Sequence, residues 1–221
     1  MTDNNVKREI LHFHKSMTNT SRDASFDFCY LYFHTKKGKL ANDMENCCMH
    51  LWSYLASWGM LRNSPLQSLS PASLKPLIAH FDDISHSNIW NIDVDSYPQE
   101  KYCIIDEYKK IESILKQIMG KAPTVTLVTK IMLGIFGCVP AFDRYFTQTF
   151  NQLYKGFYQC RDIELDYIYD FYTQHKVLLD DLSTNMYVIN FEGKPTSFTY
   201  KKAKLIDMFG FTKAMNINLS Y

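Results

Sequence analysis

Residues 125–136, with the sequence VTLVTKIMLGIF, would place apolar side chains on almost every face of a helix. Such a helix needs other elements around it, so this segment is predicted to lie buried inside the fold. Gly120 and Pro123 precede the segment, and Gly137 and Pro140 follow it. Glycine commonly ends a helix and proline cannot continue one, so a tight turn is expected on each side.

The rest of the chain also repeats apolar residues at helical spacing, whereas regular apolar–polar alternation is rare. This pattern predicts an all-α fold with at most one short strand pair near the C-terminus. Loops are short and no linker is visible, so residues 1–221 are expected to form a single compact two-lobed helical domain. Helices are predicted at residues 6–17, 26–34, 43–61, 72–85, 99–119, 125–136, 142–154, 163–182 and 200–209, and a strand at 186–191.

Charge places few limits on the binding partner. The chain has 24 basic and 23 acidic residues, a net charge of +1, so a nucleic-acid site would have to be a local patch. Two lysine clusters are candidates for such patches, but solvated turns or helix faces are the preferred interpretation. They consist of Lys36, Lys37 and Lys39, and of Lys201, Lys202 and Lys204.

The six cysteines show no Cys-x-x-Cys pair and no spacing expected of zinc or an iron–sulfur cluster. They are interpreted as buried thiols, and neither a metal nor a cofactor is predicted. The first residues are polar and charged, and no run of about 18 apolar residues occurs. A cytoplasmic protein without a membrane segment or an obligate protein partner is therefore expected.

Asp143 has the greatest chemical interest, because the turn after the buried helix brings it to the start of the next helix. An acid there is favoured by the helix dipole and can accept hydrogen bonds from free backbone N–H groups. That purely structural role is one interpretation. The other is that a carboxylate held at the mouth of a cleft acts as a base or stabilises a cation.

The segment from Ile118 to Phe146 resembles the helix–hairpin–helix superfamily of DNA glycosylases. The similarity lies in a hairpin turn, a buried helix ending in Phe-Gly, a turn with a proline, and Asp143 before an aromatic-rich helix. It covers about residues 43–155. The resemblance implies that Asp143 activates water or stabilises the sugar cation that forms as the base leaves.

The resemblance also assigns the DNA backbone contacts. Gly120, Lys121, Ala122 and Thr124 would hold the DNA backbone at the hairpin turn, together with Arg144. The family's hairpin usually carries two glycines two positions apart, and here Ala122 replaces the second. The lysine of the lyase-competent branch would fall at or near Thr124, so a monofunctional enzyme that leaves an abasic site is predicted.

Residues 52–66 are similar to the family's first core helix and the loop after it, which helps to shape the base pocket. Trp58, Met60, Arg62 and Asn63 would supply stacking surfaces and polar contacts for a base flipped out of the duplex. Tyr145 is a further candidate for the pocket wall. The many aromatic rings would suit a bulky modified base, including the glycosylated or hydroxymethylated pyrimidines of some phages.

Lys130 lies on the buried helix and is expected either to extend to the rim of the cleft or to face into it, where it would be catalytic. The sequence thus predicts a DNA glycosylase that acts on duplex DNA with a damaged or modified base.

Three other functions fit the sequence less well. An all-α ribonuclease of the toxin type would use Arg8 with His14 or His12. A helical adaptor without enzymatic activity would have no pocket beside Asp143 and an exposed apolar patch elsewhere. For a metal enzyme, the nearby acid and histidine combinations are Glu45 with His50, and Asp82 or Asp83 with His86.

Overall fold

The computed structural model describes residues 1–218 and confirms an all-α fold with one strand pair near the C-terminus. The helices within these residues are α1 (Asp3–Ser16), α2 (Ser25–Lys36), α3 (Met44–Ser57), α4 (Lys75–Asp83), α5 (Tyr97–Met119), α6 (Val125–Phe136), α7 (Arg144–Leu153), α8 (Asp162–Gln174), α9 (Lys176–Asn185) and α10 (Lys202–Asn218). Strands β1 (Tyr187–Ile189) and β2 (Pro195–Thr199) pair antiparallel.

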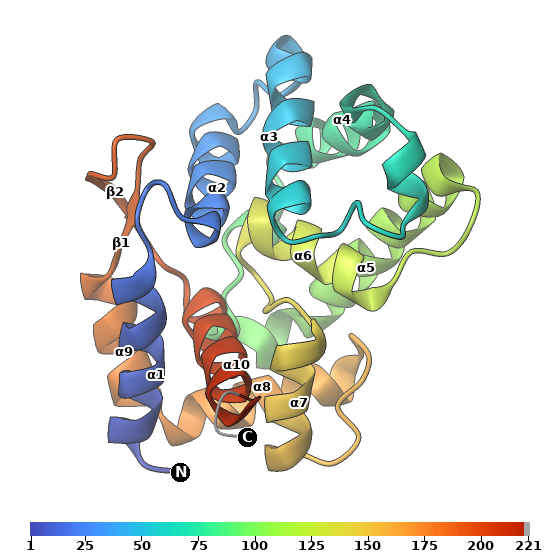
Figure 1. Cartoon of the computed structure of the whole chain (residues 1–221). Coiled ribbons are helices and arrows are strands. Elements are labelled where there is room, and N and C mark those ends of the chain that lie inside the picture. Colours follow the sequence, from blue (N-terminus) through green and yellow to red (C-terminus); the bar gives the residue numbers. More distant parts are fainter. Residues whose placement is uncertain (219–221) are drawn as a thin grey trace.

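Two groups of helices meet at α6. Figure 1 shows α2, α3, α4 and α5 around α6 in one group, and α1, α7, α8, α9 and α10 in the other. Contacts between α5 and α8 help to join the groups, and one continuous cluster of buried side chains runs through both. Within residues 1–218, no helix combines the length and the apolar character needed to cross a membrane.

Helix α6 is buried from Leu127 to Phe136, as its apolar pattern predicts. Thr124 caps its N-terminus by accepting a hydrogen bond from the Leu127 N–H, and Gly137 ends it in the left-handed conformation at φ 64°. Lys201 donates to the Phe136 carbonyl at 2.8 Å and also to the carbonyls of Trp90 and Ile92. Both ends of the helix are thereby fixed.

A close approach between α6 and α3 leads to a stability prediction. A Cβ atom added to Gly134 would lie 2.5 Å from Cε1 of Tyr54, which is 1 % exposed. We therefore expect Gly134→Ala to lower the free energy of unfolding by about 1–3 kcal/mol, despite the higher helix propensity of alanine. Urea unfolding measures the change. Ser113→Ala, at an exposed position of α5, serves as the control, and an unchanged midpoint for Gly134→Ala would contradict the prediction.

Some predicted boundaries are wrong. The helix expected at residues 163–182 is two helices, because His175 leaves helical geometry at φ −121° and ψ 24°. Its buried ring contacts the Asp3 carboxylate at 2.5 Å, which ties this break to the start of α1. The helix expected to reach Leu61 ends at Ser57, because Gly59 adopts φ 72° and reverses the chain.

The interpretation of the second lysine cluster as a solvated surface is also wrong. Lys204 is 2 % exposed and pairs with Asp207 at 2.8 Å. Burial lowers the pKa of Lys201, whose amine donates to three backbone carbonyls. These lysines therefore stabilise the interior, where a buried charge needs polar partners.

Asp27 ties α2 to the strand pair. Its Oδ2 accepts hydrogen bonds from the Ile189 N–H at 2.7 Å and the Tyr200 hydroxyl at 2.6 Å. Its Oδ1 is buried and has no hydrogen-bond partner among the described residues. Burial raises the pKa of this carboxyl from 3.8 to about 6, although the Tyr200 hydroxyl opposes the shift.

This raised pKa predicts a pH-dependent stability. Because the folded protein binds this proton more tightly than the unfolded chain, the stabilisation is complete below about pH 4 and is lost as the pH rises through 6. Asp27→Asn should remove this part of the pH dependence, on the order of 2 kcal/mol. The test measures the free energy of unfolding of the wild type and of the variant at several pH values from 4 to 7. Parallel curves of free energy against pH would contradict the prediction.

Candidate functional site

A cleft of about 590 Å³ lies beside the turn between α5 and α6, and residues from both groups of helices line it. This volume lies within the roughly 300–1,000 Å³ typical of small-molecule sites. The residues predicted from the sequence that line it are Trp58, Met60, Arg62, Asn63, Lys121, Ala122, Thr124, Lys130, Asp143, Arg144 and Tyr145. Gly120 is the predicted site residue that lies outside this lining.

The turn between α5 and α6 presents free backbone donors. Gly120 ends α5 in the left-handed conformation at φ 70°, and Thr124 caps α6 with its side chain. Lys121 and Ala122 are exposed, and their N–H groups have no acceptor within the described part of the chain. Unpaired N–H groups beside a helix N-terminus form a suitable contact for an anion such as a phosphate. Gly120 contributes the turn geometry.

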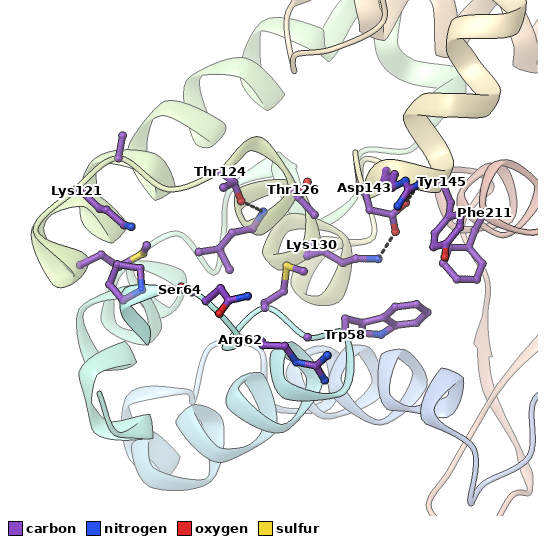
Figure 2. Close-up of a pocket in the computed structure, with 18 of the residues that line it drawn as sticks. Trp58, Arg62, Ser64, Lys121, Thr124, Thr126, Lys130, Asp143, Tyr145 and Phe211 are labelled. Carbon is purple, nitrogen blue, oxygen red and sulfur yellow. Dashed lines mark hydrogen bonds and ion pairs between the residues drawn. The ribbon is translucent and has the colours of Figure 1, made fainter. Parts of the chain in front are cut away.

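The two oxygens of Asp143 have different partners. Oδ1 accepts hydrogen bonds from the Tyr145 and Phe146 N–H groups, each at 3.0 Å, and so caps α7. Oδ2 accepts from the Lys130 amine at 2.9 Å (Figure 2). The structural interpretation is therefore right for one oxygen, while the other lies in the cleft and can accept a further hydrogen bond beside that of Lys130.

Lys130 faces the cleft from the middle of α6. The side chain is 3 % exposed, and that of Asp143 is 12 % exposed. The Lys130 amine also lies 4.1 Å from the centre of the Trp58 ring, so it bridges the carboxylate and an aromatic face (Figure 2). In this desolvated setting the ion pair fixes the orientation of Oδ2.

The loop that carries Asp143 is held by neighbouring helices. The Phe142 N–H donates to the Thr129 hydroxyl at 2.9 Å, and the Thr126 hydroxyl donates to the Phe142 carbonyl at 2.8 Å. Asp207 of α10 accepts from the Ala141 N–H at 3.1 Å. Because α6 and α10 both anchor this loop, the position of the carboxylate is set before any ligand binds.

Aromatic rings form the inner wall of the cleft. Phe211 of α10 lies edge-on to Trp58 and to Tyr145, with ring centres 5.6 and 5.0 Å apart. The Arg22 guanidinium also lies over the Trp58 ring, 4.7 Å from its centre. Aromatic rings together with the planar Arg22 guanidinium form a wall that is suited to contact with a planar ligand.

The cleft carries a local positive charge, although the whole chain is nearly neutral. Asp143 is the acidic side chain among the described lining residues, and Lys130 pairs with it. The basic side chains of the lining are Arg22, Arg62, Lys121, Lys130 and Arg144. A net positive cleft in a chain of net charge +1 favours an anionic ligand at this place.

No family model, curated protein or solved structure matches this chain. The resemblance to the helix–hairpin–helix glycosylases therefore stays a prediction, and any function proposed for the protein rests on the geometry of the cleft.

Sequence reasoning missed Arg22 and Phe211. Arg22 lies in a short turn before α2, and Phe211 lies on α10, so both are far in sequence from Asp143. No local spacing connects them to the cleft. An apolar stripe on the last helix was visible in the sequence, but it indicates packing and gives no reason to expect a cleft residue.

The residues of the competing functions do not meet in this cleft. Arg8 forms an ion pair with its neighbour Glu9, and the His14 ring packs edge-on to Tyr200 at 5.9 Å. Asp82 accepts a hydrogen bond from the Leu40 N–H. Among residues 1–218, no three His, Cys, Asp or Glu side chains are grouped as a metal site would require.

Proposed function

We propose that this protein is a monofunctional DNA glycosylase that excises a damaged or modified base and leaves an abasic site. The observation that carries the proposal is the Asp143 carboxylate, with one oxygen bound to the start of α7 and the other in a cationic, aromatic-lined cleft. A carboxylate that is rigidly held beside a binding site for an anionic, planar ligand suits hydrolysis of a nucleotide's glycosidic bond.

The chemistry assigns one role to each group. As the bond between C1′ and the base breaks, its electron pair leaves with the base, and the negative Oδ2 of Asp143 stabilises the sugar cation. A water molecule then bonds to C1′ and gives a proton to Asp143, which releases it to solvent and becomes a carboxylate again. The departing base takes up one proton from solvent, so the protons balance. Lys130, held 2.9 Å away, keeps Oδ2 in place throughout.

The surroundings of Asp143 supply the contacts that a flipped nucleotide needs. The free N–H groups of Lys121 and Ala122, together with the Arg144 and Arg62 side chains, would bind phosphates at the rim. The inner aromatic wall would stack against the extruded base. A pocket beside Asp143 also disfavours the adaptor, which requires that none be present.

Single-turnover incubation with modified duplexes tests the proposal. The substrates are duplex oligonucleotides with alkylated, deaminated, hydroxymethylated or glucosylated bases and modified phage DNA, each followed by alkali. We expect strand breaks that appear only after alkali. Parallel samples with borohydride should trap no covalent complex, because a monofunctional enzyme forms no Schiff base. Intact strands in every duplex, with cleavage of RNA oligonucleotides, would contradict the glycosylase and favour the ribonuclease.

A further inference from the structure

A second pocket of about 450 Å³ lies next to the cleft, between α2 and α3. The two meet at Arg22, which lines both, and Ser57 and Trp58 are consecutive residues that line one pocket each. Phe191 from the turn between β1 and β2 also lines the second pocket. A ligand group seated beside Trp58 would thus lie next to this additional space.

The chemistry of the second pocket differs from that of the cleft. Arg22 is its charged residue at neutral pH, since burial lowers the pKa of His50 and keeps its imidazole neutral. The other polar lining groups are uncharged hydroxyls, an amide and a thiol. They belong to Thr20, Ser21, Ser25, Cys29, Asn46, Ser53, Tyr54 and Ser57.

One of these hydroxyls has no partner. Ser25 Oγ is buried without a hydrogen bond among the described residues, and an unpaired buried hydroxyl is costly. A ligand that offers a hydrogen bond would remove this cost. The density of neutral donors and acceptors thus favours a ligand rich in hydroxyl groups over a phosphate, for which more cations would be expected.

Aromatic surface completes the pocket. Phe191 is 76 % exposed, and its ring centre lies 5.2 Å from that of Phe28. An exposed phenylalanine beside neutral polar groups is a suitable contact for the C–H face of a sugar ring, because the ring's π face is negative.

We propose that the second pocket is a subsite for an uncharged, polyhydroxylated substituent, such as a hexose, that is attached to the base held in the cleft. This inference rests on the proposed function, since it requires the base to lie beside Trp58 and Asp143. With this subsite, the substrate class is DNA with glycosylated bases. Residues of α2, of α3 and of the turn between β1 and β2 would then determine which substituent on the base is accepted.

The test measures binding to three duplexes in which one position is cytosine, hydroxymethylcytosine or glucosylated hydroxymethylcytosine. The protein carries Asp143→Asn to prevent turnover, and fluorescence anisotropy gives Kd. We expect roughly tenfold tighter binding of the glucosylated duplex than of the hydroxymethylated one, as for one or two additional hydrogen bonds. Equal Kd values for these two duplexes would overturn the subsite.

Variants test whether the second pocket causes the tighter binding of the glucosylated duplex. Ser53→Phe places a bulky ring in the pocket from an exposed position of α3 and should abolish the preference. Ser113→Phe, at an exposed position of α5 that lines neither pocket, is the matched control and should retain it. Ser25→Ala removes the unpaired hydroxyl and should reduce the preference about threefold. If Ser53→Phe and Ser113→Phe bind alike, the subsite is overturned.

The outcomes separate the two proposals. Excision by the wild-type protein without preference for the glucosylated duplex would retain the glycosylase and remove the subsite. A Ser53-dependent preference in binding, with no excision from any duplex, would retain the subsite and remove the glycosylase.

Discussion

Asp143→Asn is expected to slow base release in a single turnover by about 10²–10⁴-fold. The asparagine amide can neither accept a proton from water nor offer a negative charge to the sugar cation. Its side-chain oxygen can still accept from the Tyr145 and Phe146 N–H groups, so the cap on α7 should persist. Quantifying alkali-labile sites against time for wild type and variant gives the ratio of rates.

The control for this variant is Asp162→Asn, which changes an exposed acid in the first turn of α8 and should leave the rate unchanged. Circular dichroism must show the same helical content in all three proteins. Full activity in folded Asp143→Asn would show that the carboxylate serves only as a helix cap, and the proposed mechanism would then be wrong.

Lys130→Met is expected to lower the free energy of unfolding by about 2–3 kcal/mol, because it leaves Asp143 Oδ2 without a counter-ion in a largely desolvated site. The loss should stay below that of a fully buried pair, since α7 still donates two N–H groups to Oδ1. Methionine keeps the apolar bulk of the lysine stem, so packing changes little. Urea unfolding measures the effect.

The double variant Lys130→Met, Asp143→Asn isolates the ion pair. Each single change leaves one uncompensated charge, whereas the double change leaves none. We therefore expect the double variant to be more stable than the sum of the single changes predicts, by at least about 1 kcal/mol. Strict additivity would mean that the 2.9 Å contact contributes nothing to stability.

The parts of the site that are contiguous in sequence were predictable. The bounds of α6 follow from its apolar segment and the glycines and prolines around it, and the helix cap at Asp143 follows from the turn. From the sequence, the Lys130 side chain was expected either at the rim of the cleft or inside it. The structure places its amine inside the cleft, against Asp143. Helix periodicity fixes which side of α6 this lysine occupies, but not which neighbouring helix covers it.

The second pocket could not be predicted. Its residues come from three separated segments, and each of them, such as Ser25, Ser53 or Phe191, is unremarkable in its local sequence. Tertiary packing brings them together. The break at His175 was missed for a similar reason, because a contact with Asp3, 172 residues away, accompanies the break.

The two halves of the cleft are anchored differently. Phe142, the residue before Asp143, is held to α6 by the hydroxyls of Thr126 and Thr129, so a change in that helix would disturb the position of Asp143 and the core together. Arg62 and Asn63 instead lie in an exposed loop that follows Gly59. Exposed positions of this loop such as Arg62 can accept mutations at little thermodynamic cost, whereas Gly59 and Asn63 have positive φ angles that restrict replacement. Under the proposed function, exchange of residues 60–62 should therefore change substrate choice while Asp143 and Lys130 keep their positions.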